Sequence, residues 1–227
     1  MEEQPYINAR MRAILVDWLV EVHMRFRLVP DTLYLAIYAL DRYLAAATVA
    51  REGLQVAGVA ALLLASKYEE IYPPEMCDLV YVTDRACARE AILAAERDML
   101  ARLEFRLTVP TVYCFLLRYL KAAHADRCIV QLACYISERM LLEARMLRHL
   151  PSVAASAAVY LSRRACNRNA WSPTLARYTG YNVAALTPCL RDICEAMRRP
   201  CDLRASKRKF GTREFGAVSS LDVDWTV

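Results

Sequence analysis

Residues 54–75 read LQVAGVAALLLASKYEEIYPPE, and this stretch decides the fold. Its first half is almost purely apolar and lacks the alternation of polar and apolar residues that marks a half-buried strand. Lys67 is the first charged side chain of the run, and Tyr72-Pro73-Pro74 ends any helix because proline has no amide hydrogen to donate. We therefore expect a deeply buried helix over residues 54–69 that carries its first charge near its C-terminal end.

The composition of the whole chain favours helices throughout. Hydrophobic residues make up 57% of the 227 residues, and the 5 glycines are fewer than the tight turns of a mixed sheet protein need. The formal charge of +5 is mild and does not by itself indicate a nucleic acid partner. No apolar run reaches the roughly 18 residues of a membrane span, and residues 1–8 lack the apolar core of a signal peptide. The sequence thus predicts an all-α protein.

The sequence contains none of the motifs that would indicate an enzyme. A Walker loop, GxGxxG, HExxH and GxSxG are all missing, and the three histidines are scattered. The adjacent carboxylates of Glu69 and Glu70 would point about 100° apart on a helix, which suits no shared acid–base site. We expect no catalytic residue, no cofactor and no metal ion.

The nine cysteines are odd in number and include no CxxC pair of the kind that binds zinc. Eight of them fall in apolar helical patterns, so we expect them to be buried free thiols in a reducing compartment. These eight are Cys77, Cys87, Cys114, Cys128, Cys134, Cys166, Cys189 and Cys194.

The chain resembles itself when it is shifted by 97 residues without gaps, so that Asp41 falls on Glu138. Around that position, Leu35, Ala36, Tyr38, Arg42 and Leu44 fall on Leu132, Ala133, Tyr135, Arg139 and Leu141. The same offset holds in four segments, which indicates two copies of one fold of about 100 residues. The alternative is a chance match of alanine and leucine in a helical protein.

Each copy is expected to hold five helices. In the first copy we place them near residues 9–27, 32–47, 54–69, 74–81 and 86–102. Asp31 is the expected N-cap of the second helix. In the second copy Pro151 opens a helix, and Ser172-Pro173 supplies an N-cap followed by proline in the first turn. The tail from about residue 203 has little periodicity and is expected to lie over the surface.

The first expected helix carries more apolar surface than one core-facing side needs. Met11, Ile14, Leu15, Trp18 and Val22 form one stripe at helical spacing, and a second apolar stretch lies on another side of the helix. Such a helix is either wholly internal, or it packs on the core with one side and offers the other to a partner.

Three strings are long and unusual enough to carry a family resemblance. Residues 11–22 read MRAILVDWLVEV, residues 62–75 read LLLASKYEEIYPPE, and residues 81–84 read YVTD. They resemble the opening helix, the third helix and the segment before the fifth helix of the cyclin box in mitotic A/B-type cyclins. The resemblance covers roughly residues 5–221 and looks closest to the A type. It implies two tandem cyclin boxes of five helices each, over residues 1–108 and 109–227.

The resemblance implies that the first box binds a cyclin-dependent protein kinase. Lys67 and Glu96 match the charged pair of the kinase-binding edge. Neighbouring kinase contacts are matched by Tyr68, Glu69, Ile71, Phe105 and Leu107. Without the resemblance, Lys67 and Glu96 would be interpreted as two solvated surface charges of little energetic value, and Phe105 and Leu107 as ordinary core residues.

The resemblance also implies a groove that docks substrates or inhibitors carrying an Arg-x-Leu motif. The matching positions are Met11, Ile14, Leu15, Trp18, Glu21, Leu54 and Gln55. An exposed apolar groove can accept a hydrophobic side chain of an extended peptide, and Glu21 at its rim can pair with the peptide's basic residue. Arg12 and Asp41 match an internal ion pair between the first two helices.

These implications describe a non-enzymatic regulatory subunit of a cell-cycle kinase, nuclear and cytoplasmic, with no membrane or nucleic acid partner. The alternative is a two-box transcription factor, which needs a basic stripe for DNA; we interpret the charges of this chain as interspersed. Lys207-Arg208-Lys209 is interpreted as a solvated run of charges in the tail. The resemblance also leads us to expect a degradation signal, but we find no Arg-x-x-Leu followed by asparagine in an expected exposed segment. It further leads us to expect a helix before the first box, for which residues 1–6 are too short.

Overall fold

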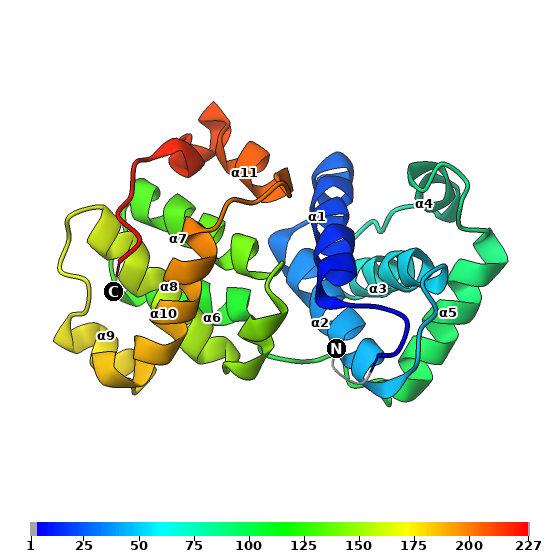
Figure 1. The fold of residues 1–227 in the computed structure, drawn as a ribbon, viewed down its shortest axis with the longest axis horizontal. Helices are drawn as coiled ribbons and strands as arrows, with labels where there is room; N and C mark the ends of the chain where they lie inside the picture. Colours follow the sequence, from blue (N-terminus) through cyan, green and yellow to red (C-terminus); the bar gives the residue numbers. More distant parts are fainter. Residues whose placement is uncertain (1–3, 227) are drawn as a thin grey trace. The chain divides into compact units, whose positions relative to one another are not determined.

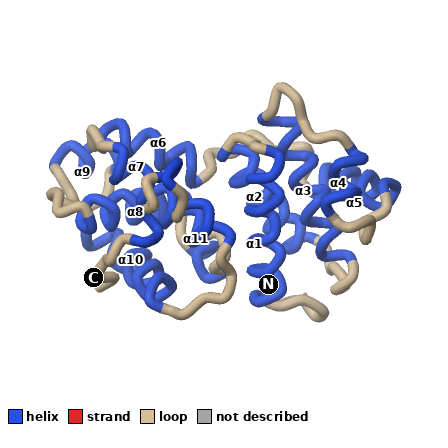
Figure 2. The backbone as a smooth tube through the Cα atoms, turned by 90° about the horizontal axis from the view of Figure 1, so that it is seen from above, coloured by secondary structure: helices blue, strands red, loops and turns tan. Residues whose placement is uncertain are grey.

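The computed structural model describes residues 4–226, and within that range it consists of helices and loops without a strand (Figures 1 and 2). The all-α class predicted from the sequence is therefore confirmed. Backbone contacts divide the chain into two compact units, Met1–Thr111 and Val112–Val227. None of the helices in the described part of the chain combines the length and the apolar character that crossing a bilayer requires.

The described part of the first unit, residues 4–111, contains five helices. They are α1 (Ala9–Phe26), α2 (Pro30–Ala46), α3 (Gly53–Glu69), α4 (Met76–Val82) and α5 (Arg89–Arg102). The predicted helix over residues 54–69 is α3, which packs against α1, α2 and α5 and is buried from Ala57 to Ser66. A helix that is apolar on every side can be stable only at the centre of a bundle, and α3 occupies that place.

The start of α2 differs from the expected cap. Val29 is the N-cap and Pro30 the first helical residue, so Asp31 lies inside the first turn and the N-cap prediction was wrong. The capping oxygen comes instead from Glu70, whose Oε1 accepts hydrogen bonds from the Val29 amide at 2.7 Å and the Thr32 hydroxyl at 2.6 Å. A carboxylate at a helix N-terminus is favourable because the amide groups there lack partners. The end of α3 is thereby tied to the start of α2.

A buried ion pair joins α1 to α2. The guanidinium of Arg12 is almost completely buried and donates to both carboxylate oxygens of Asp41, at 2.5 and 2.7 Å. Removing one partner of such a pair would leave an uncompensated charge inside the bundle, at a cost of about 3–5 kcal/mol. The two residues that the resemblance assigns to a structural pair are thus in bidentate contact.

The second unit repeats the helix order of the first. Its elements are α6 (Val112–Ala122), α7 (Arg127–Met140), the 3-10 helix η1 (Ala144–Arg148), α8 (Pro151–Ala165), α9 (Pro173–Thr179) and α10 (Val183–Arg198). Helix α7 begins 97 residues after α2, and α9 spans the residues 97 positions after α4. Pro151 opens α8, and Ser172 caps α9 through the Leu175 amide, as the sequence predicts. The offset found in the sequence is therefore the offset between equivalent helices.

The tail is not the surface segment that the sequence suggests. It forms α11 (Ala205–Phe210) and the short 3-10 helices η2 (Arg213–Phe215) and η3 (Val218–Ser220). Phe210 and Val218 are buried in the core of the second unit. Lys209, expected to be solvated with its neighbours, is also buried and binds Glu138 Oε2 at 2.5 Å. Such short helices contribute too few apolar residues to show a period, so the sequence pattern could not reveal their docking.

The cysteines differ in burial more than expected. Cys87, Cys189 and Cys194 are buried, and burial raises the pKa of the Cys189 thiol to about 12. Cys77, Cys114 and Cys128 are exposed, so the prediction of a buried thiol was wrong for these three. Within the described residues, no cluster of His, Cys, Asp and Glu side chains could hold a metal ion.

Candidate functional site

The charged pair predicted at the edge of the first unit is formed. Lys67, in the last turn of α3, donates from Nζ to both carboxylate oxygens of Glu96 on α5, at 2.7 and 2.9 Å. The side chain of Glu96 is only 8% exposed, whereas that of Lys67 is 48% exposed. Glu96 therefore acts as a buried anchor that holds the Lys67 ammonium at the surface.

Large apolar side chains that follow Lys67 on α3 and Glu96 on α5 in the sequence are exposed. Ile71 is 88% exposed and Phe105 is 73% exposed. Tyr68 is about half exposed, and its hydroxyl lies 2.5 Å from Thr108 Oγ1. Tyr72 is as exposed as Ile71, although the sequence pattern marks it only as part of the helix stop. Uncovered apolar side chains of this size next to a positioned charge are typical of a protein-binding surface.

The outward position of Phe105 is set by the backbone after α5. Glu104 and Phe105 both adopt left-handed conformations, with φ of 52° and 57°, which non-glycine residues rarely do. The Phe105 amide donates to the Leu100 carbonyl at 3.0 Å, which closes the turn. The ring is thereby directed to solvent, while Leu107 lies partly buried against the core of the first unit.

The two adjacent carboxylates at the end of α3 take different positions. Glu70 binds the start of α2, as described above, whereas Glu69 remains exposed at the edge. Partial burial raises the pKa of Glu69, and the negative charges of Asp31 and Glu70 raise it further. Of these two carboxylates, Glu69 is the one that a partner protein can reach.

A separate hollow lies between α1 and the start of α3. Its volume is about 400 Å³, and its lining residues are Met11, Ile14, Leu15, Trp18, Arg51, Leu54 and Gln55. Six of the seven residues predicted for a docking groove therefore line one cavity. Ile14 is about half exposed, whereas Leu15 and Leu54 are buried and form part of its floor.

A glycine allows the floor of this groove to form. A Cβ atom added to Gly58 on α3 would lie 2.7 Å from Leu15 Cδ1, closer than real Cβ contacts come. The missing side chain therefore leaves room for Leu15 between α1 and α3. Glycine inside a helix costs about 0.5–1 kcal/mol relative to alanine, and here that cost accompanies a close approach of two helices.

Glu21 and Arg51 differ from the prediction. Glu21 is exposed on α1, one turn beyond Trp18, and does not line the cavity. Arg51 does line the cavity, although the sequence pattern does not predict this. Arg51 precedes α3 in a loop, where no helical period assigns it to a face. Its position three residues before Leu54 was the one available signal.

The described residues form an all-helical protein with two similar helical units, and the first unit carries an exposed charged edge and an apolar hollow. The chain matches "Cyclin, N-terminal domain" over residues 1–108 and "Cyclin, C-terminal domain" over residues 110–224. It belongs to the cyclin family, and its two units are tandem cyclin boxes.

Individual relatives place the chain among mitotic cyclins. It is 44% identical over 224 residues to G2/mitotic-specific cyclin S13-7 of Glycine max, covering 97% of this chain and 87% of the relative. It is 43% identical over 226 residues to Cyclin-A1 of Xenopus laevis, and the match covers 98% of this chain and 54% of the frog protein. It is 42% identical over 222 residues to Cyclin-B1-5 of Oryza sativa subsp. japonica, and the match covers 96% of this chain and 49% of the rice protein. The chain thus spans about half the length of the frog and rice relatives, and the predicted mitotic A/B type is confirmed.

Solved structures show the same fold. A viral cyclin from herpesvirus saimiri superposes with a TM-score of 0.76 at 19% identity, covering 86% of this chain and 87% of the viral one. A chain of the yeast RNA Pol II CTD kinase CTDK-1 complex superposes with a TM-score of 0.71 at 13% identity, covering 94% and 78%. At these identities the likeness concerns the fold.

Proposed function

We propose that this chain is the regulatory subunit of a cyclin-dependent Ser/Thr protein kinase, which it binds and activates through the edge that carries Lys67 and Glu96. The observation that supports this most directly is the exposed Lys67 ammonium, held by a buried carboxylate among uncovered apolar side chains. The proposal assigns the chain a regulatory role and no chemistry of its own. The yeast chain that shares this fold is part of a kinase complex, the RNA Pol II CTD kinase CTDK-1 complex.

The edge has the two components that a stable protein interface needs. Ile71 and Phe105 supply apolar area that a partner can cover, which is where most binding free energy arises. An ammonium group has three donors, and Glu96 accepts two hydrogen bonds from Lys67. One donor of Lys67 is left for an acceptor on the kinase. Because Glu96 already fixes the lysine, little side-chain entropy is lost on binding.

Activation follows from binding to one conformation of the kinase. A free kinase can hold its catalytic Lys–Glu ion pair apart, and this pair must form before phosphoryl transfer is efficient. If the edge of the cyclin contacts the kinase only in the active arrangement, the interface free energy shifts the equilibrium toward that arrangement.

Substrate docking is the second part of the proposal. The groove between α1 and α3 accepts the apolar side chain of an Arg-x-Leu segment, and Glu21 on the same helix attracts its basic residue. Holding a substrate this way raises its effective concentration beside the kinase. For such a complex we propose a nuclear and cytoplasmic location, as the family resemblance implies.

The kinase-binding assignment is tested by replacing both members of the pair, in Lys67→Ala/Glu96→Ala. The double variant removes the partner-facing charge without leaving a buried carboxylate unpaired, so it is expected to fold. We expect kinase affinity and the activation of a purified mitotic cyclin-dependent kinase to fall by about tenfold or more, as for an interface hot spot. The matched control is Lys121→Ala/Glu214→Ala, which removes one exposed charge of each sign from the second box. Activation by the Lys67/Glu96 variant equal to that of the control would refute the assignment.

A further inference from the structure

The charge of the chain is distributed unevenly between its two boxes. Residues 1–111 contain 12 Lys and Arg against 16 Asp and Glu, which gives −4, whereas residues 112–227 contain 18 against 9, which gives +9. The interpretation of the charges as interspersed was therefore wrong at this scale. A box with such a surplus attracts anionic partners in general, so the position of its arginines decides which kind of anion fits.

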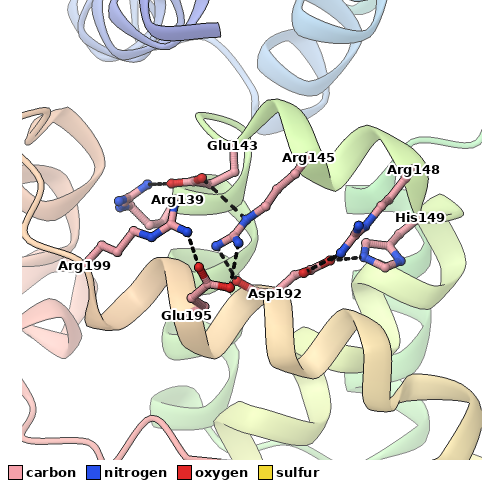
Figure 3. Close-up of polar contacts among 8 residues, drawn as sticks. All are labelled: Arg139, Glu143, Arg145, Arg148, His149, Asp192, Glu195 and Arg199. Atoms are coloured by element: carbon pink, nitrogen blue, oxygen red, sulfur yellow. Dashed lines mark hydrogen bonds and ion pairs between the residues drawn. The ribbon is translucent and has the colours of Figure 1, made fainter.

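Several of these arginines meet at one place, between the end of α7, η1 and the C-terminal half of α10 (Figure 3). Asp192 on α10 is the centre of one half of the network. Arg148 donates to both of its carboxylate oxygens, at 2.6 Å from Nη2 and 3.1 Å from Nε. His149 Nε2 lies 2.5 Å from the same carboxylate. Asp192 therefore fixes the direction of the Arg148 guanidinium.

The other half of the network is centred on Glu195, one turn further along α10. Arg145 from η1 donates to Glu195 Oε2 at 2.8 Å and to the Asp192 carbonyl at 3.1 Å. Arg199, just beyond α10, binds the other oxygen of Glu195. Arg139 and Arg145 both approach Glu143, at 3.5 and 3.8 Å.

The carboxylates of Asp192 and Glu195 stay ionised and hold the arginines in place. Burial acts to raise the pKa of Asp192, but hydrogen bonds from Arg148 and His149 outweigh it and the pKa is lowered. Hydrogen bonds from Arg145 and Arg199 lower the pKa of Glu195. The guanidinium groups are therefore oriented before any partner arrives, which reduces the entropy lost on binding.

The network nevertheless keeps a positive surplus at the surface. Its guanidinium groups, on Arg139, Arg145, Arg148 and Arg199, outnumber the carboxylates of Glu143, Asp192 and Glu195. The side chains of Arg148 and Arg199 are 61% and 53% exposed although both are paired. Leu147 and Leu150, which flank Arg148 and His149 in the sequence, are also more than half exposed.

We propose that this arginine network and its two flanking leucines form a docking surface for an acidic, leucine-containing segment of a partner protein. Charge complementarity supports this occupant, because the surface lies in the box with the +9 surplus and presents two oriented, exposed guanidinium groups. Guanidinium groups bind carboxylates through paired hydrogen bonds. Leu147 and Leu150 offer aliphatic area, which suits peptide side chains better than nucleobases, whose usual platforms are aromatic rings.

The experiment measures fluorescence anisotropy of a labelled Glu-Leu-Glu-Asp-Leu-Glu-Glu peptide with the full chain. The test variant is Arg148→Gln/Arg199→Gln, and its matched control is Arg118→Gln/Arg177→Gln, which removes two exposed arginines from α6 and α9. We expect the test variant to bind about tenfold more weakly and the control to stay within about twofold, because Asp192 and Glu195 orient the guanidinium groups of Arg148 and Arg199. Equal losses in both variants would mean a diffuse charge effect and would overturn the proposal.

A second variant tests the same surface in case the arginine variant does not fold. Leu147→Ser/Leu150→Ser leaves every ion pair of the network intact and is expected to weaken the peptide about fivefold by removing apolar contact area. Tighter binding of a phosphoserine peptide, a single-stranded DNA or an anionic vesicle than of the acidic peptide would also overturn the proposal. The assay contains no kinase, so its outcome is independent of the kinase-binding test.

Discussion

Side chains of α1 differ in what they contribute to the proposed docking groove. Trp18 lines the groove and also packs against two apolar clusters of the first box. Ile14 lines the same groove, but about half of its side chain is exposed. A change at Trp18 would therefore mix lost stability with lost docking, whereas a change at Ile14 isolates docking.

We predict that Ile14→Ala weakens the docking of Arg-x-Leu substrates without reducing the stability of the protein. Phosphorylation of a substrate that carries an Arg-x-Leu segment should lose roughly tenfold in kcat/KM, because about 1–2 kcal/mol of apolar contact is lost. A short substrate without the segment should be unaffected. The matched control is Met24→Ala, at an exposed apolar position of the same helix that does not line the groove. If both substrates lose activity equally, the groove is not where the segment binds.

At this scale the sequence predicts most of the groove and misses one part. Met11, Ile14, Leu15 and Trp18 are visible because helical spacing puts them on one side of α1. Arg51 is missed because its position depends on how the loop before α3 folds against α1. A positive charge in the groove is a property of tertiary structure, which no local period encodes.

Equivalent ion pairs of the two boxes take their cations from different elements. The repeat places Asp41 of α2 and Glu138 of α7 at matching positions. Asp41 binds Arg12 of α1, at the start of the first box. Glu138 binds Lys209 of α11, at the end of the second box, and that lysine also lies over the Phe210 and Phe215 rings. Helix α11 thus completes the second box, as α1 completes the first.

The element-scale prediction concerns Lys209→Met, which preserves volume and removes the charge. Glu138 would be left buried without its cation, so we expect the second box to lose about 3–5 kcal/mol of stability. The double variant Lys209→Met/Glu138→Gln should recover most of this loss, because no charge is then buried. Urea unfolding of the unmodified protein, the single variant and the double variant measures the effect. If Lys209→Met leaves the free energy of unfolding unchanged, α11 is not held by this ion pair.

The same variant should show a defined pH dependence. Burial raises the pKa of Glu138, and the charge and hydrogen bond of Lys209 lower it. Without Lys209 the folded-state pKa rises further above the unfolded value of about 4.3. In this variant, the contribution of protonated Glu138 to the free energy of unfolding is fully present below the unfolded pKa. It is lost as pH rises through the folded pKa of Glu138. The stability difference from the unmodified protein should therefore be smaller at pH 5 than at pH 8.

Elements also differ in how well the sequence reveals them. Helices α2 and α3 are long and apolar, and the repeat relates them to α7 and α8, so the existence and order of these helices could be predicted. Helix α11 spans only Ala205–Phe210, and three of its six residues are Lys or Arg. Its docking depends on Phe210 and Lys209 reaching distant partners on α7, which include Tyr135 and Glu138. Contacts of this kind appear only when the chain has folded.

At the scale of the whole molecule, the two boxes have separate cores and separate proposed partners. The large apolar cluster of the second box extends from Val112 to Trp225, and those of the first lie between Ile7 and Val109. Among the described residues, no member of these three clusters comes from the other box. Each box therefore buries its own apolar surface, which is the condition for folding as an independent domain.

The whole-molecule prediction is that fragments 1–111 and 112–227 each fold and divide the functions between them. Each fragment should give a single cooperative urea transition, because each holds a complete core. The first fragment should bind the kinase and the Arg-x-Leu peptide, and the second should bind the acidic peptide within about threefold of the full chain, since the arginine network lies entirely within it. Calorimetric titration of each fragment with each ligand provides the test. Acidic-peptide binding by the first fragment, or a second fragment that stays unfolded, would show that the boxes do not act as separate modules.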